Sequence, residues 1–466
     1  MKAKVVIALI ALSMTVAGCS SPGSDSENSA NTTETINQPV TVEEVAALGD
    51  ITLDVWADAG EENTMKILIP QYEAMYPNVK VNLTIKGFDD LMSTVVPALA
   101  GEGAPDVAQG NQGYGVDGAL VKAGLIRKLT DVATAYNWSS IYNSGDFGQF
   151  SWSEDGSQYG SGELFGMSPV AEFVGVFYNK KKLAKLGIAV PTSFDEFAAA
   201  LETAKKAGET PIVLGNSDQW PATHVFGLIQ GAFTPASETK DFITGAPGSS
   251  FVSTTNETAL NTLRDWIKKG YFTKGYDGVS ADDATAKFAA GDGVFYMGGT
   301  WFAGTIGEGL GEDAGFIANP AAGSGKRAGT GSYGLGWHIS SKTDALSASV
   351  AFLAMIMDAE FAQSLASLNR IPSAKTSLEA SSSLLKDMQN AGASMFADSG
   401  LTFYLDWATD TMYDVYTSKL QEFMAGRIDA SVMMQAIQDN WTKFQESRSN
   451  KKLRCEAPLQ IKVRCV

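Results

Sequence analysis

Residues 51–86 read ITLDVWADAGEENTMKILIPQYEAMYPNVKVNLTIK and alternate between two kinds of pattern. The first six residues and residues 79–86 carry apolar side chains at every second position, which is typical of β-strands. Between them, residues 62–76 carry apolar side chains three and four positions apart, as an amphipathic helix does. Pro77 then ends the helical pattern. This order predicts two parallel strands joined by a helix.

The same alternation continues along the rest of the chain. A helix at 88–100 and a short strand at 106–109 extend the first unit, and no long linker separates this unit from the later segments. A glycine-rich loop is expected at 321–332. The sequence therefore predicts two α/β lobes that share more than one chain crossing. Further strands are expected at 174–178, 212–214, 293–297 and 335–340, and helices at 193–207, 223–232, 256–269, 281–290, 346–358, 407–424 and 430–447.

The N-terminus has the features of a bacterial lipoprotein signal. Lys2 and Lys4 precede the apolar stretch Val5–Val16, which is too short to span a bilayer as a helix. Small residues then lead to Cys19, whose thiol can carry a diacylglyceryl group, and two acyl chains give stable anchoring. We expect a signal peptide at 1–18 and a lipid anchor on the extracytoplasmic face of the cell membrane. The alternative is an ordinary secretory signal in which the cysteine is incidental.

The two ends of the mature chain differ in composition from its body. Residues 19–47 are rich in small and polar side chains and are expected to form a lipidated, disordered tether. Residues 449–466 are basic and contain two cysteines. They are predicted to be a tail added by cloning or by readthrough. The alternative is a native tail closed by a disulfide between Cys455 and Cys465.

The composition excludes several classes of function. A formal charge of −17 gives the protein no electrostatic attraction to nucleic acid or to anionic lipid, so its membrane contact would come through the anchor only. Between residues 20 and 450 there is no cysteine, and the whole chain has two histidines. Little is therefore available for thiolate metal sites or for nucleophilic catalysis. We expect no cofactor, no metal ion and a monomer that binds a neutral ligand.

Several short segments of the chain occur in a characteristic order behind the lipobox. They are Leu53-Asp-Val-Trp56-Ala-Asp, Ala104-Pro-Asp-Val-Ala108, Val176-Phe-Tyr-Asn-Lys180, Met297-Gly-Gly-Thr-Trp301 and Gly336-Trp-His-Ile-Ser340. In this order they resemble the family 1 extracellular solute-binding proteins of bacterial ABC importers, whose best-known members bind maltose and other sugars. The resemblance covers residues 50–445.

The resemblance implies an α/β, two-lobed periplasmic-binding-protein type II fold, with a ligand cleft between lobes that are joined by hinge strands. The N-terminal lobe would comprise 48–158 plus 332–372, and the C-terminal lobe 159–331 plus 373–448. It also implies a function without catalysis. The protein would capture a small oligosaccharide by closure of the cleft and deliver it to the permease subunits of an ABC importer.

A neutral sugar offers hydroxyl groups, which carboxylates and amides bind, and C–H faces, which pack on aromatic rings. By the resemblance, Glu172 would accept sugar hydroxyls, Trp301 would stack on a ring, and an aromatic would enter the cleft near Trp407. His338 is expected to be satisfied in the core, and His224 is left undecided. The candidate ligand-binding residues are Asp58, Glu61, Asn111, Tyr114, Glu172, Asp218, Trp220, Trp301, Tyr333, Asp406 and Trp407.

Two alternatives belong to other classes of protein. A secreted lipoprotein glycoside hydrolase would also have carboxylates and tryptophans in its site. It would need two carboxyl groups roughly 5–10 Å apart around the scissile bond, and the sequence singles out no such pair. A surface lipoprotein that binds no sugar would need no hinged, aromatic-lined cleft. Binding of intact sugar would separate the first interpretation from both.

Overall fold

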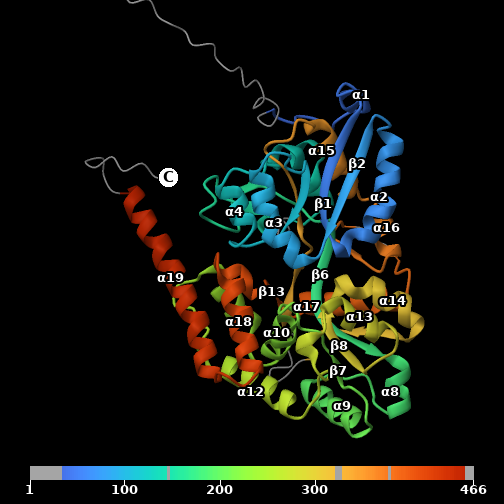
Figure 1. Ribbon diagram of the computed structural model, residues 1–466, viewed down its shortest axis with the longest axis vertical. Helices are drawn as coiled ribbons and strands as arrows, with labels where there is room; N and C mark the ends of the chain where they lie inside the picture. Colours follow the sequence, from blue (N-terminus) through green and yellow to red (C-terminus); the bar gives the residue numbers. More distant parts are fainter. Residues whose placement is uncertain (1–33, 144–146, 321–327, 376–378, 457–466) are drawn as a thin grey trace, which may run out of the picture.

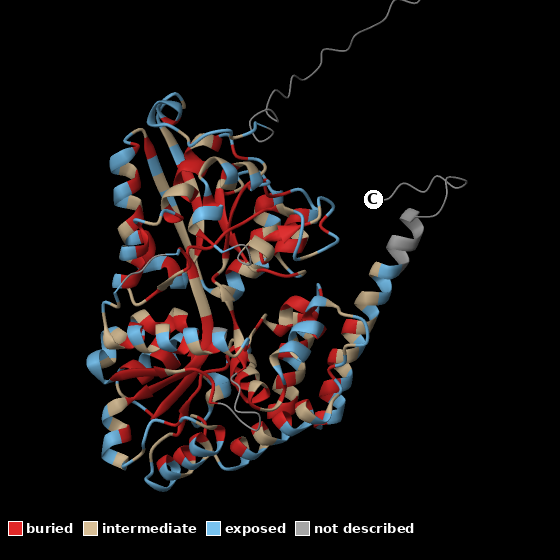
Figure 2. Cartoon of the chain, turned by 180° about the vertical axis from the view of Figure 1, so that it is seen from behind, coloured by how far each residue is buried: buried red, intermediate tan, exposed pale blue. Residues whose placement is uncertain are grey.

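The computed structural model describes residues 34–143, 147–320, 328–375 and 379–456, and it contains two α/β lobes stacked along the long axis of the molecule (Figure 1). Cys19, the predicted lipid attachment site, and residues 457–466 lie outside the described residues. In both lobes the buried residues concentrate on the sheets and on the helix faces that cover them (Figure 2). The prediction of a two-lobed α/β fold is therefore confirmed.

The sheet of the N-terminal lobe has the strand order β11-β3-β1-β2. β1 (Ile51–Asp58) and β2 (Val79–Lys86) pair in parallel over their whole length, as the alternating pattern predicts. Leu53, Val55 and Ala57 are fully buried, so one face of β1 belongs to the core. The remaining elements are β3 (Val107–Gly110), β11 (Gly336–Ile339), α2 (Glu62–Met75), α3 (Phe88–Ala100), α15 (Leu346–Ile356) and α16 (Ala362–Ser367).

The sheet of the C-terminal lobe is built around β6 (Val170–Asn179), a strand of ten residues. β6 pairs antiparallel with β8, β9, β10 and β12. The other strands are β7 (Ile212–Val213), β8 (Phe295–Gly299), β9 (Ala314–Ile317), β10 (Gly329–Tyr333), β12 (Ile371–Pro372) and β13 (Leu401–Thr402). The helices include α8 (Lys180–Leu186), α9 (Phe194–Lys206), α10 (Pro221–Phe233), α11 (Ala236–Thr244), α12 (Thr254–Lys268), α13 (Ala281–Ala289), α14 (Ala303–Leu310), α17 (Ser383–Ala397), α18 (Met412–Met424) and α19 (Ala430–Glu456).

Three segments lie side by side where the chain passes between the lobes. Ala171 on β6 is paired with Tyr333 on β10 and with Ile371 on β12. β11 follows β10 directly and belongs to the other sheet, so the chain changes lobe within a few residues there. These hinge strands place Glu172, the neighbour of Ala171, at the junction of the lobes. The assignment of whole sequence ranges to each lobe stays a prediction.

Two expectations need correction. The predicted loop at 321–332 contains most of β10. Gly331 of β10 is paired with Phe173 of β6. Glycine fits at this position, whereas a Cβ would lie 2.3 Å from the Phe173 side chain. The predicted disordered tether is ordered from residue 34. Its Ile36 N–H donates to Asp131 at 2.8 Å, and α1 (Val42–Ala46) begins with a capping box. Hydrogen bonds attach this segment to the lobe. The sequence did not indicate this order, because the segment contains few apolar residues.

Among residues 34–143, 147–320, 328–375 and 379–456, no helix is both long and apolar enough to cross a membrane. The same residues contain no group of three or more histidine, cysteine or acidic side chains that could hold a metal ion. The expected helix at 407–424 is divided in the structure. A 3-10 turn, η6 (Leu405–Ala408), precedes α18, and this turn places Asp406 at the junction of the lobes.

Candidate ligand site between the lobes

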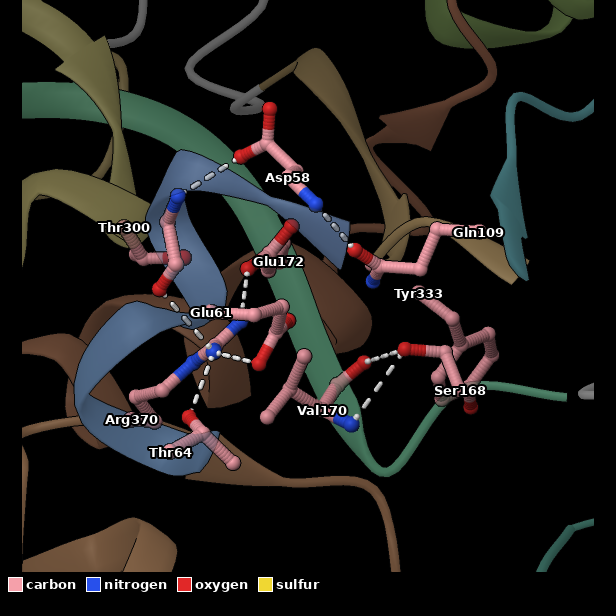
Figure 3. A network of polar contacts seen from close by, with 12 residues as sticks. Asp58, Glu61, Thr64, Gln109, Ser168, Val170, Glu172, Thr300, Tyr333 and Arg370 are labelled. Atoms are coloured by element: carbon pink, nitrogen blue, oxygen red, sulfur yellow. Dashed lines mark hydrogen bonds and ion pairs between the residues drawn. The ribbon is translucent and has the colours of Figure 1, made fainter. Parts of the chain in front are cut away.

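A cluster of charged side chains lies where β1, the hinge strand β6 and the residue before β12 meet (Figure 3). The Arg370 guanidinium donates from Nη1 to Glu61 Oε2 at 2.5 Å and from Nη2 to Glu172 Oε1 at 2.8 Å. Nη1 also donates to Thr64 Oγ1 at 3.0 Å. The Arg370, Glu61 and Glu172 side chains are only 10%, 5% and 12% exposed. Arg370 therefore joins the hinge to the end of β1 by charge-assisted hydrogen bonds.

Acidic groups outnumber basic ones in this cluster. Burial raises the pKa of Glu172 to about 7, although the neighbouring Arg370 opposes the shift. Burial also raises the pKa of Asp58 to about 6, against the hydrogen bond that its carboxylate accepts from the Gly60 N–H at 2.8 Å. The backbone N–H of Asp58 donates to Gln109 Oε1 at 2.8 Å, which fixes the end of β1. The cluster thus presents carboxylates that can accept hydrogen bonds from a ligand.

A second cluster is aromatic and belongs to the C-terminal lobe. Trp220 precedes α10, and Trp301 lies in the 3-10 turn η4 (Thr300–Phe302) that follows β8. The His224 ring lies between them, with centroids 5.3 Å from Trp220 and 5.1 Å from Trp301. Trp220 also stacks on Phe302 at 6.1 Å. Both tryptophans are partly exposed, so a ligand can reach the cluster.

The glycines of the Met297-Gly-Gly-Thr-Trp301 segment make room for this arrangement. A Cβ built on Gly299 would lie 1.9 Å from the Trp301 ring, which folds back over the strand end. Any other residue at this position would move the indole. The segment that carried the family resemblance therefore has a local steric role, because it sets where the Trp301 ring lies.

Asp406 and Asn111 come together from opposite lobes. Asn111 follows β3, and its side chain lies close to the Asp406 carboxylate. Burial raises the pKa of Asp406 to about 6, and the backbone N–H of Asp406 and, to a smaller extent, the Asn111 amide oppose the rise. Trp407 beside it is 2% exposed and packs on Gly113, where a Cβ would lie 2.5 Å from that of Trp407. Trp407 therefore fills the junction between the lobes and presents no open face to a ligand.

Three other predicted residues have structural contacts of their own. Asp218 Oδ2 accepts the Ala281 N–H at 2.6 Å, at the N-terminus of α13, where a carboxylate is favourable. The Tyr114 ring packs on Phe444 of α19 at 4.8 Å and is covered by Arg448 at 5.1 Å. Tyr333 N–H donates to Gln149 at 3.3 Å on the hinge strand β10. The structure brings Asp58, Glu61 and Glu172 into one cluster, Trp220 and Trp301 into a second, and Asn111 and Asp406 into a third.

The sequence patterns did not indicate Arg370, although it is the cation around which the carboxylates gather. Arg370 lies two residues before the predicted lobe boundary at 372, and this position is the signal that could have indicated it. Phe88 and Tyr413 were missed as well. Tyr413 donates to Asp89 Oδ1 at 2.7 Å, and Phe88 contacts Trp220 with ring centroids 6.1 Å apart. These contacts join α3 of one lobe to α18 and to the residue before α10 of the other.

Comparison with known proteins gives three findings. The family model described as bacterial extracellular solute-binding protein matches residues 58–362. A multiple sugar-binding protein of Streptococcus mutans is 28% identical over 177 residues, which are 36% of this chain and 40% of that protein. An uncharacterized ABC transporter extracellular-binding protein of Pyrococcus horikoshii is 25% identical over 264 residues, 53% of this chain and 54% of that one. The chain thus matches about half, or less, of the length of these curated relatives.

Solved structures agree on the fold. A chitin oligosaccharide binding protein aligns with a TM-score of 0.74 at 21% identity, over 85% of this chain and 99% of the other. At this identity the likeness concerns the fold alone. The family model extends from the end of β1 to α16 and covers more than half of the chain. The protein therefore belongs to the family of bacterial extracellular solute-binding proteins.

Proposed function

We propose that this protein, acting as a monomer, captures a small neutral oligosaccharide between its lobes. It would then deliver the sugar, chemically unchanged, to the permease of an ABC importer. The observation that carries the proposal is the pairing of two kinds of surface at the junction of the lobes. Buried carboxylates gather around Arg370 on the hinge side, and the partly exposed rings of Trp220 and Trp301 lie on the C-terminal lobe.

The chemistry of these surfaces suits a sugar. Carboxylate oxygens of Asp58, Glu172 and Asp406 accept hydrogen bonds from hydroxyl groups, and indole rings pack against the C–H faces of pyranoses. A net acidic site would repel anionic solutes. The names of the Streptococcus mutans relative and of the chitin oligosaccharide binding protein point to the same class of ligand.

The first experiment is a binding screen of the purified protein against neutral di- to tetrasaccharides of the chito, malto and xylo series. We expect a rise in melting temperature with at least one of them, followed by a calorimetric titration. Chromatography of the ligand after incubation should recover it intact. Because a raised carboxyl pKa such as that of Glu172 also suits a general acid, appearance of shorter sugars would replace this proposal by a hydrolase.

Two variants of Trp301 test whether the sugar binds at the proposed site. Trp301→Leu removes the flat aromatic face, whereas Trp301→Phe keeps part of it. We expect the leucine variant to lose at least about ten-fold in affinity, the order expected for a stacking aromatic pair and its buried area, and the phenylalanine variant to lose less. Equal affinities for both variants and the wild type would place the sugar elsewhere on the protein.

The proposal includes an extracytoplasmic position with a lipid anchor on Cys19. It is supported by the basic residues, the apolar stretch and the small residues that precede this cysteine. Replacing Cys19 by alanine should move the protein from the detergent phase to the aqueous phase in a phase-partition assay. Retention of the variant in the detergent phase would contradict a lipid on this residue.

A further inference from the structure

His224 is a buried side chain in the first turn of α10, and the sequence predicts no role for it. It is 9% exposed, and its ring is surrounded by Trp220, Trp301 and Tyr404 at centroid distances of 5.3, 5.1 and 5.8 Å. All three contacts are edge-to-face. The imidazole is thus held within the aromatic cluster of the candidate site.

The Nδ1 atom of His224 is buried and has no hydrogen-bond partner among the residues that the structure describes. Buried polar atoms in folded proteins are nearly always satisfied, because leaving one unpaired is unfavourable. Burial also lowers the pKa of His224 to about 3, so the ring is neutral at physiological pH. A neutral imidazole has one donor and one acceptor nitrogen.

The second histidine of the chain shows how a histidine is satisfied in this core. His338 is 2% exposed, and both of its ring nitrogens have partners. Nδ1 lies 2.8 Å from the Phe165 carbonyl oxygen, and Nε2 lies 3.2 Å from Asp117 Oδ1. The contrast suggests that His224 receives its partner from outside the residues that the structure describes, and a bound ligand is such a partner.

A small cavity lies beside the ring. His224 lines it together with other polar side chains, among them Gln230 of α10, Asp406 of η6 and Tyr404, which directly precedes η6. Its volume is about 10 Å³, which leaves room for roughly one hydroxyl group or one water molecule. A sugar that packs on Trp220 or Trp301 could place one hydroxyl or hydroxymethyl group here. Asp406, on the wall of the same cavity, offers a second acceptor.

We propose that His224 is a specificity-determining residue of the site, which hydrogen bonds one hydroxyl group of a neutral pyranose through Nδ1. This inference rests on the proposed function and goes beyond it, because it names the polar contact that selects among sugars. Sugars that lack a hydroxyl at the matching position would leave Nδ1 unpaired. Such an unpaired group discriminates more strongly than a change in apolar contact does.

Two variants at position 224 test the inference. His224→Phe keeps a flat ring but has no nitrogen, and His224→Asn places an amide near the position of Nδ1. For the sugar that binds the wild type best in the neutral panel, we expect the phenylalanine variant to lose about ten-fold in affinity, as loss of a buried hydrogen bond implies. The asparagine variant should lose less. Unchanged melting temperatures of the free proteins would show that both variants fold.

Nitrogen NMR of protein labelled in its two histidines supplies an independent readout. The bound sugar should move the Nδ1 resonance of His224 and leave His338 unchanged, with the His224→Phe variant assigning the signals. If the wild type and the phenylalanine variant bind the sugar equally and the resonance stays in place, the partner of Nδ1 is water only and the inference falls. If no sugar of the panel binds the wild type at all, the proposed function itself falls.

Discussion

Arg370 Nη2 lies 2.8 Å from Glu172 Oε1, and this contact joins two of the segments by which the chain passes between the lobes. Both side chains are nearly buried, as is Glu61 on the other branch of the guanidinium. Removing the arginine would leave two buried carboxylates without their cation. We expect Arg370→Met to lower the free energy of unfolding by about 3–5 kcal/mol, the range for breaking a buried ion pair on one side.

Urea denaturation of the free protein measures this effect. A control is Lys66→Met, because the side chains of Lys66 and of its ion-pair partner Glu62 are 64% and 57% exposed. The loss of that ion pair should be much smaller because water screens it. The double variant Arg370→Met with Glu172→Gln should recover part of the stability, since one buried charge is then removed. Equal losses for the Arg370 and Lys66 variants would contradict the importance of the buried cluster.

The raised pKa of Glu172 predicts a dependence of stability on pH. Its pKa is about 7 in the folded protein, against a value near 4.5 for an ordinary glutamate. Between these values the folded state binds more protons than the unfolded state, so stability falls as the pH rises from about 4.5 to 7. Asp58 and Asp406, with pKa values of about 6, act in the same direction.

Unfolding of the wild type and of Glu172→Gln at a series of pH values tests this. His338, whose pKa is raised, adds to the loss of stability with rising pH, whereas His224, whose pKa is lowered from 6.5 to about 3, opposes it below about pH 6.5. Both histidines are present in both proteins, so the difference between the two proteins is the specific readout. The wild type should lose more stability than the glutamine variant as the pH rises from about 4.5 to 7. Parallel pH profiles would rule out an unusual titration of Glu172.

The local patterns predicted most of the fold because apolar periodicity reports which face of each element is buried. The helix expected at 88–100 has these bounds in the structure, and the strand at 79–86 does as well. β10 was missed because its Gly-Thr-Gly-Ser-Tyr sequence shows no apolar alternation. Its position depends on pairing with β6, far away along the chain, and on glycine fitting against Phe173.

The site was predicted less completely than the fold, for a similar reason. Glu61 and Glu172 were expected near the ligand, and both lie in the charged cluster, but Arg370 comes from a segment about 200 residues later than Glu172. Asp218 and Trp407 have residue types suited to a sugar; Asp218 accepts an N–H of α13, and Trp407 is buried at the junction of the lobes. Their part in ligand binding stays a prediction, because residue type and position at the end of an element do not separate a structural contact from a contact with a ligand.

Gly299 is expected to affect ligand affinity indirectly, through the position of the Trp301 ring. Its Cβ would meet the Trp301 ring at 1.9 Å, so Gly299→Ala should displace the indole. We expect a loss of sugar affinity comparable to that of Trp301→Leu. Gly304→Ala is the matched control, because a Cβ there would have no neighbour closer than 3.6 Å and Gly304 lies within α14. Calorimetric titration of both variants should show weakened binding for the first and normal binding for the second. Normal binding by Gly299→Ala would mean that the indole position does not matter.

The hydrogen bond of the Tyr413 hydroxyl is expected to affect the dissociation rate of a bound ligand. It donates to Asp89 Oδ1 at 2.7 Å and so connects α18 of one lobe with α3 of the other, on the side of the molecule where Phe88 also contacts Trp220. Tyr413→Phe removes this hydrogen bond and little else. Because the bond forms only where the lobes touch, we expect its loss to favour opening and to raise the dissociation rate of the sugar several-fold, as a hydrogen bond to a charged group implies.

Tyr72→Phe provides the comparison, because the Tyr72 hydroxyl donates to the Ala348 carbonyl oxygen at 2.8 Å within one lobe. This variant should lower the melting temperature and leave the dissociation rate unchanged, whereas Tyr413→Phe should do the reverse. Stopped-flow measurement of intrinsic tryptophan fluorescence would follow dissociation, since Trp220 and Trp301 lie at the site. If both variants released the sugar at the wild-type rate, the contact between Asp89 and Tyr413 would have no part in retaining the ligand. A change in the rate for Tyr72→Phe alone would instead assign retention to the stability of the N-terminal lobe.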